Sequence, residues 1–155
     1  MHDRGRRLSA AEKLEDQLLW LTENGLDACE LDDRATLRRT AVDLARKVPN
    51  HSAVLAASGG LARVDGDVER AIRLYRRALE HNPPPKLRAD VLEELIAIEG
   101  SRENFLQVET LLAIAIADHP DHLGLRSLRA LLRAGRNEPS ARDDIEDILE
   151  SSPDL

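Results

Sequence analysis

The chain has 155 residues, enough for a domain with a real core, and its 42% of apolar residues excludes a disordered acidic chain. Only 2% of the residues are aromatic, so the core must come from Leu, Ile, Val and Ala, a composition that favours helices. The net charge of −7 argues against bulk nucleic-acid binding, and a single cysteine excludes an intramolecular disulfide.

The chain also lacks the sequence signals of a membrane or secreted protein. No apolar run approaches the length of a membrane-spanning helix, and the basic residues of the N-terminus are not followed by an apolar core. We therefore expect a cytoplasmic protein that does not bind a membrane. Nearly all basic residues are arginine, which we attribute to a bacterial genome of high GC content.

The N-terminal third predicts a tail followed by two helices. Residues 1–8 are polar and are expected to be disordered, and Ser9 with Glu12 fits a capping box at a helix start. This helix ends at Gly25, and residues 25–34 form a long loop. A second helix is predicted over about 35–47.

The clearest segment is 52–85. Its first helix, SAVLAASGGLARV, contains many small residues, and Gly66 in the following turn permits a positive φ. Asp67 can cap the second helix, VERAIRLYRRALEHN, which stops at three consecutive prolines because proline cannot continue a helix.

Four further helices are predicted, over 86–100, 104–118, 121–134 and 138–151. Each has an apolar set that we expect to be buried. These sets are Val91, Leu92, Leu95, Ile96 and Ile98; Phe105, Val108, Leu111, Leu112, Ala115 and Ile116; Leu125, Leu128 and Leu132; and Ala141, Ile145, Ile148 and Leu149.

Prolines recur at a nearly constant interval along these helices. Pro49, Pro83, Pro120 and Pro153 each follow an amphipathic helix, at spacings of 34, 37 and 33 residues. Such a period is typical of helical repeat arrays. It predicts one repeat domain over 9–155, built from antiparallel helical hairpins at about 9–49, 52–83, 86–120 and 121–153.

Seven positions of segment 52–85 carry a family pattern in register: Gly59, Gly66, Asp67, Ala71, Tyr75, Ala78 and Pro83. In these positions the segment resembles the tetratricopeptide repeat family. It departs from the pattern at Leu55 and Ala62, where the family has aromatic residues, and the other three hairpins match fewer positions. The resemblance implies an all-α, right-handed solenoid of about four antiparallel helical hairpins.

In that family the first helices of successive hairpins line a concave groove, and the resemblance implies a partner-binding groove here. The corresponding residues are Ala53, Ala56, Gly60, Arg63, Asp90, Glu93, Glu94, Ala97, Arg126, Ala130 and Arg133. The small residues among them would let a partner helix or extended peptide approach closely. Alternatively, they only let neighbouring helices of the array pack closely.

Charged side chains form stripes on three of the predicted helices. Arginines recur at helical spacing over 126–136 and over 70–77, which usually indicates a solvated face and alternatively a surface for an anionic partner. The closing helix is acidic, with Asp143, Asp144, Glu146, Asp147 and Glu150. We expect these carboxylates to form the polar outer face of a terminal repeat, or to pair with a basic stripe on another copy.

Nothing in the sequence points to catalysis, a metal or a cofactor. Four of the five histidines lie beside the repeat prolines without any ligand spacing, and His81 and His119 are explained by the dipole at a helix C-terminus. Nearby carboxylates are expected to reduce the reactivity of Cys29. We therefore expect neither an enzyme nor a metal-binding or cofactor-binding protein.

These features favour a protein–protein interaction module, a scaffold or adaptor that binds a peptide or helix of a protein partner in its concave groove. Two alternatives stay open. The first is a chaperone of bacterial secretion substrates, which resembles this chain in size and acidity. The second is a structural protein that assembles with itself into homo-oligomers.

Overall fold

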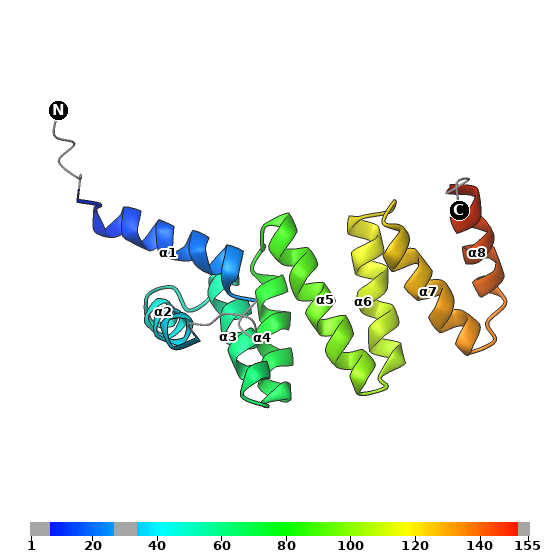
Figure 1. Cartoon of the computed structure of the whole chain (residues 1–155), viewed down its shortest axis with the longest axis horizontal. Coiled ribbons are helices and arrows are strands. Elements are labelled where there is room, and N and C mark those ends of the chain that lie inside the picture. Colours follow the sequence, from blue (N-terminus) through cyan, green and yellow to red (C-terminus); the bar gives the residue numbers. More distant parts are fainter. Residues whose placement is uncertain (1–6, 27–33, 152–155) are drawn as a thin grey trace. The chain divides into compact units, whose positions relative to one another are not determined.

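A computed structural model of the chain describes residues 7–26 and 34–151. In this part of the chain there are eight α-helices and no β-strand (Figure 1). The helices are α1 (Ala10–Asn24), α2 (Arg34–Lys47), α3 (Ser52–Val64), α4 (Val68–Glu80), α5 (Pro85–Ser101), α6 (Phe105–Asp118), α7 (Leu123–Gly135) and α8 (Ser140–Ser151). The predicted all-α class is confirmed, and the packing of consecutive helices fits a helical repeat.

The chain divides into two compact units, Met1–Val91 and Leu92–Leu155, and the boundary falls within α5. Three parts of the predictions lie outside the described residues: residues 1–6 of the predicted tail, residues 27–33 of the predicted long loop with Cys29, and Pro153. None of the helices in the described ranges combines the length and the apolar character needed to cross a bilayer.

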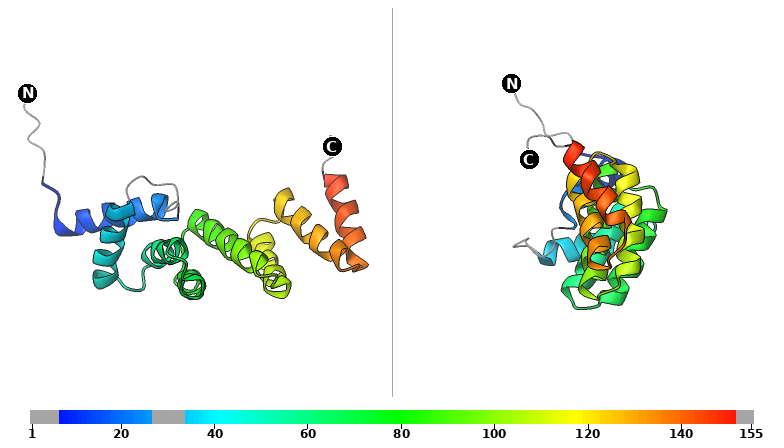
Figure 2. Two further views of the ribbon diagram at one scale, coloured as in Figure 1. Left: turned by 60° about the horizontal axis from the view of Figure 1, so that its bottom comes forward. Right: turned by 90° about the vertical axis from the view of Figure 1, so that its right-hand side faces the viewer.

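In the first unit, α3 is the central helix and packs against α1, α2 and α4 (Figure 2). Its small residues make this close packing possible. A Cβ atom on Gly59 would lie only 2.7 Å from the ring of Tyr75, which is fully buried. A Cβ atom on Gly25 would lie 2.8 Å from the Cβ of Ala57. Glycine at these two positions therefore sets how closely α4 and the end of α1 approach α3.

The local signals read from the sequence account for the helix ends of this unit. Ser9 and Glu12 form both hydrogen bonds of the capping box at the start of α1. Gly66 has a φ of 82°, and the Asp67 side chain accepts a hydrogen bond from the Arg70 N–H at 3.1 Å. These predictions of the capping box, the turn and the cap are confirmed.

In the second unit, α7 packs against α6 on one side and forms a hairpin with α8 on the other (Figure 2). The predicted apolar set of α5 is buried throughout, and so are Val108, Leu111, Leu112 and Ala115 of α6. The prediction was wrong for four other residues, which are exposed: Phe105, Leu128, Ile145 and Leu149. The apolar surface of the α7–α8 hairpin is therefore only partly covered.

Candidate protein-binding surfaces

A groove of about 340 Å³ lies between α2 and α3 of the first unit. We call it the basic groove. Its lining residues are Arg38, Ala41, Val42, Ala45, Arg46, Ser58, Leu61, Ala62, Asp65 and Arg70. Apolar and small side chains make up most of this set, and three arginines and one aspartate supply the charge. The groove therefore combines apolar contacts with an excess of positive charge.

An ion pair ties α2 to the end of α3 within this groove. The Arg38 guanidinium donates two hydrogen bonds to the Asp65 carboxylate, at 2.9 and 2.8 Å, in the bidentate geometry that suits an arginine and a carboxylate. These bonds hold the pKa of Asp65 below its ordinary value, with smaller effects from the charges of Arg70 and Arg34. Asp65 is the only carboxylate among the described residues that line the groove, and it is thus already satisfied.

The remaining arginines of the groove are more open to a ligand. Arg46 is exposed and has no ion-pair partner among the described residues. Arg70 lines the groove from α4, and further along the same helix Arg77 donates a hydrogen bond to Asn50 at 2.8 Å, beside the start of α3. Two members of the predicted stripe at 70–77 therefore lie toward the α2–α3 side of the unit.

The local charge is opposite in sign to that of the whole chain. Residues 34–80 contain ten Arg or Lys side chains and five carboxylates, an excess of five positive charges, whereas the chain has a net charge of −7. The basic groove was not among the predicted sites. A charge count by segment would have indicated it, because the overall acidity conceals this basic segment.

The predicted concave-groove residues of α3 have a different environment. Ala53, Ala56 and Gly60 are buried, on a helix that packs against three others, whereas Arg63 at the end of α3 is exposed. Burial of the three small residues favours the alternative reading of the sequence, in which they allow close helix packing.

The predicted groove residues of α5 are more accessible. Asp90 forms an ion pair with Lys86 at 3.5 Å, one helical turn away. Glu93 and Ala97 are exposed and Glu94 is half-buried. These residues fall on both sides of the boundary between the two units, so a single groove over all the first helices stays a prediction.

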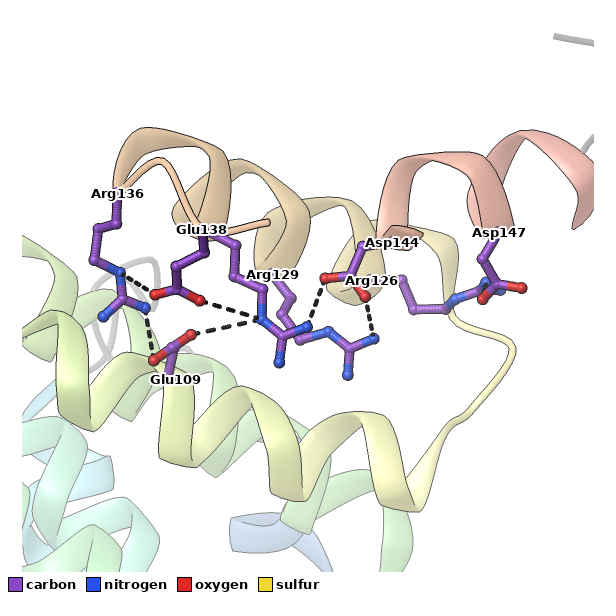
Figure 3. Close-up of polar contacts among 8 residues, drawn as sticks. Glu109, Arg126, Arg129, Arg136, Glu138, Asp144 and Asp147 are labelled. Carbon is purple, nitrogen blue, oxygen red and sulfur yellow. Dashed lines mark hydrogen bonds and ion pairs between the residues drawn. The ribbon is translucent and has the colours of Figure 1, made fainter. Parts of the chain in front are cut away.

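The predicted groove residues of α7 belong to a packed seam. Arg126 and Ala130 are buried, and Arg133 is about one-quarter exposed. Arg126 pairs with Asp147 of α8, and the Asp144 carboxylate accepts a hydrogen bond from Arg129 at 3.1 Å (Figure 3). The same carboxylate accepts a hydrogen bond from Arg133 at 2.8 Å.

The same arginine stripe also contacts α6. Arg136 lies 2.6 Å from the Glu109 carboxylate and 3.2 Å from Glu138 (Figure 3). Arg133 lies 3.8 Å from Glu109. The stripe at 126–136 is therefore not a solvated face, and its arginines are held by carboxylates of their own unit. Asp144 and Asp147 likewise pair within the hairpin. The expectation of a polar outer face was wrong for Asp144, whose side chain is only 12% exposed, whereas the Asp147 side chain is 68% exposed.

Two histidines have a structural role that the sequence analysis missed. The Nδ1 atom of His51 accepts a hydrogen bond from the Ala53 N–H at 3.2 Å, and Nδ1 of His122 accepts one from Leu125 N–H at 3.3 Å. Both side chains cap helix N-termini. In the described part of the chain, no three His, Cys, Asp or Glu side chains are grouped so that they could hold a metal ion.

Neither a scan against models of protein families nor a search of curated proteins found a match for this chain.

Proposed function

We propose that this chain is a protein-interaction module that binds acidic peptide segments in the basic groove of its first unit. The observation that carries the proposal is the groove itself, with apolar contacts from α2 and α3 and three arginines, of which Arg46 is unpaired among the described residues. A peptide with carboxylates and aliphatic side chains complements both properties.

A protein ligand fits this surface better than a nucleic acid. Binding of single-stranded nucleic acid relies on aromatic side chains that stack on bases, and none of the described residues that line the groove is aromatic. Tyr75, the aromatic residue of this unit that is closest in sequence to the groove residues, is fully buried.

We also propose that the chain is a right-handed array of the tetratricopeptide kind. The contact between Gly59 and Tyr75, the turn at Gly66 and the cap at Asp67 support this, because all four residues belong to the pattern that resembles the family. In this proposal the chain acts as a cytoplasmic scaffold or adaptor.

Fluorescence anisotropy tests the binding proposal directly. The probe is a short fluorescein-labelled peptide in which Glu and Asp alternate with Leu. We expect Arg46→Glu to weaken binding roughly tenfold, because it replaces an attractive charge by a repulsive one beside the ligand. Val42→Asp, in the apolar part of the groove, is expected to have a similar effect.

Arg102→Glu is the matched control, since it changes the net charge equally but lies in the second unit. It is expected to leave the affinity within about twofold. Equal losses for Arg46→Glu and Arg102→Glu would show that only net charge matters. If a labelled oligonucleotide of similar charge bound more tightly than the peptide, the ligand of the groove would be a nucleic acid and the proposal of an acidic peptide would be wrong.

A further inference from the structure

The α7–α8 hairpin has two different seams. One seam is closed by the ion pairs of Arg126, Arg129 and Arg133 with Asp144 and Asp147. The other is an open groove of about 290 Å³, which we call the apolar groove, lined by Ser127, Ala130, Leu131, Ala134, Ile145, Ile148 and Leu149. None of the described residues that line it carries a charge.

Large apolar side chains at this groove are left in contact with water. Leu131 is 70% exposed, Leu149 57% and Ile145 44%. The apolar surface continues around α7 through Gly124, Leu128 and Gly135, which are also exposed. A contiguous exposed apolar surface of this kind marks an interaction site.

We propose that a second copy of this chain covers the apolar groove, through the same hairpin in both copies. The hairpin has a projecting leucine, Leu131, beside a groove that can admit an aliphatic side chain. When two copies are related by a two-fold axis, each presents its leucine to the other's groove, as a self-complementary interface requires.

The charges of the hairpin favour this occupant. Residues 123–151 contain five arginines and six carboxylates, so the hairpin is nearly neutral although the chain has a net charge of −7. Two copies can therefore approach through this face with little repulsion. The ion-paired seam meanwhile holds α7 and α8 together, so that the groove is preformed.

The exposed flank of α8 has a positive charge near one end and a negative charge near the other, an arrangement that suits antiparallel pairing. Arg142 lies near its N-terminal end and pairs with Glu146 at 2.8 Å, and Glu150 lies in its last turn. Arg142 and Glu150 are about 12 Å apart along the helix, too far to pair within one copy. An antiparallel partner brings Arg142 of one copy toward Glu150 of the other, which gives two equivalent attractive contacts.

Sedimentation equilibrium of the full chain over a range of concentrations tests this inference. We expect the mass to rise from 17.2 kDa toward twice that value. Leu131→Glu should weaken the association by more than about a hundredfold, because it buries a charge in an apolar contact. Leu106→Glu is the control, because Leu106 is 68% exposed on α6 of the same unit but does not line the groove.

Charge exchange distinguishes a second copy from other occupants. Arg142→Glu and Glu150→Arg should each weaken association by about threefold, and the double variant should restore it. The inference is overturned if the parent chain keeps a mass of 17.2 kDa at every concentration, or if Leu131→Glu and Leu149→Glu associate as strongly as the parent. Binding of another protein to the apolar groove of a monomeric chain would also overturn it.

Discussion

Single residues set the helix ends and the close contacts of this chain. His51 caps α3 with its unprotonated Nδ1 atom, which serves as an acceptor only while the ring is neutral. Burial of the side chain lowers its pKa, in agreement with this role. Two of the four histidines beside the repeat prolines, His51 and His122, therefore cap helix N-termini.

The cap predicts a pH dependence of stability. Because the pKa of His51 is lower in the folded chain than in the unfolded chain, its contribution is complete above about pH 6.5 and is lost as the pH falls from there through the lowered pKa. His51→Asn retains a capping side chain that does not titrate. The loss of melting temperature on acidification should therefore be smaller in this variant than in the parent chain.

His119→Asn is the control for this measurement, since its side chain is exposed and makes no hydrogen bond among the described residues. Its pH profile should follow that of the parent. A His51→Asn profile that is parallel to the parent profile would show that the cap does not titrate as described.

The close contact at Gly59 leads to a prediction about the free energy of unfolding. Gly59→Ala would place a methyl group 2.7 Å from the Tyr75 ring, and the resulting shift of α4 should cost about 1–3 kcal/mol of unfolding free energy in urea titrations. Gly100→Ala is the matched control, because nothing lies within 4 Å of its Cβ position in α5. It should stabilise the chain by about 0.5–1 kcal/mol, and destabilisation of similar size in both variants would contradict the packing explanation.

At the scale of elements, the α3–α4 and α7–α8 hairpins pack by different chemistry. Gly59 lies 24 residues before Pro83, and Arg129 lies 24 residues before Pro153. At the first position the glycine admits the ring of Tyr75, whereas at the second the arginine pairs with Asp144. Hairpins that share a register in the sequence therefore differ in what holds them together.

The burial of Asp144 in the ion-paired seam leads to a prediction about the free energy of unfolding. Its side chain is only 12% exposed and accepts hydrogen bonds from two arginines. Asp144→Asn therefore removes the counter-charge of the partly buried Arg129 and leaves Arg133 only its longer contacts with Glu109 and Glu138, at 3.8 and 4.0 Å. We expect a loss of about 1.5–3 kcal/mol in urea unfolding.

Glu146→Gln is the control, because Glu146 pairs with Arg142 while both side chains are largely exposed, and it should cost less than about 0.5 kcal/mol. Similar losses of unfolding free energy in the two variants would mean that the burial of the seam does not strengthen its ion pairs.

At the scale of the whole molecule, charge is unevenly distributed. Residues 34–80 have a net charge of +5, so the rest of the chain carries −12. An acidic ligand is therefore attracted locally by a chain that repels it at longer range. Added salt should weaken peptide binding to the parent chain and should have less effect on Arg46→Glu, as measured by anisotropy at low and high ionic strength. The same salt response in both chains would place the ligand elsewhere.

The positions of the helices could be predicted from the sequence, whereas the candidate binding surfaces could not. Periodic prolines, the cap at Asp67 and the glycine at 66 are local signals, and the structure has a helix end or a turn at each place where they lie within the described residues. The pairing of Arg133 with Asp144 and the exposure of Leu131 depend on how one helix is rotated against another. No periodicity within a single helix contains that information, so the arginine stripe was expected to face solvent.

The central claim is that the basic groove binds an acidic peptide, and chemical-shift mapping tests it most directly. The isotope-labelled full chain is titrated with the Glu/Asp–Leu peptide while the backbone amide signals are followed. We predict that the largest shift changes concentrate at Arg38, Val42, Arg46 and Leu61, which line the groove. Changes concentrated in α7 and α8, or no changes at saturating peptide, would contradict the account.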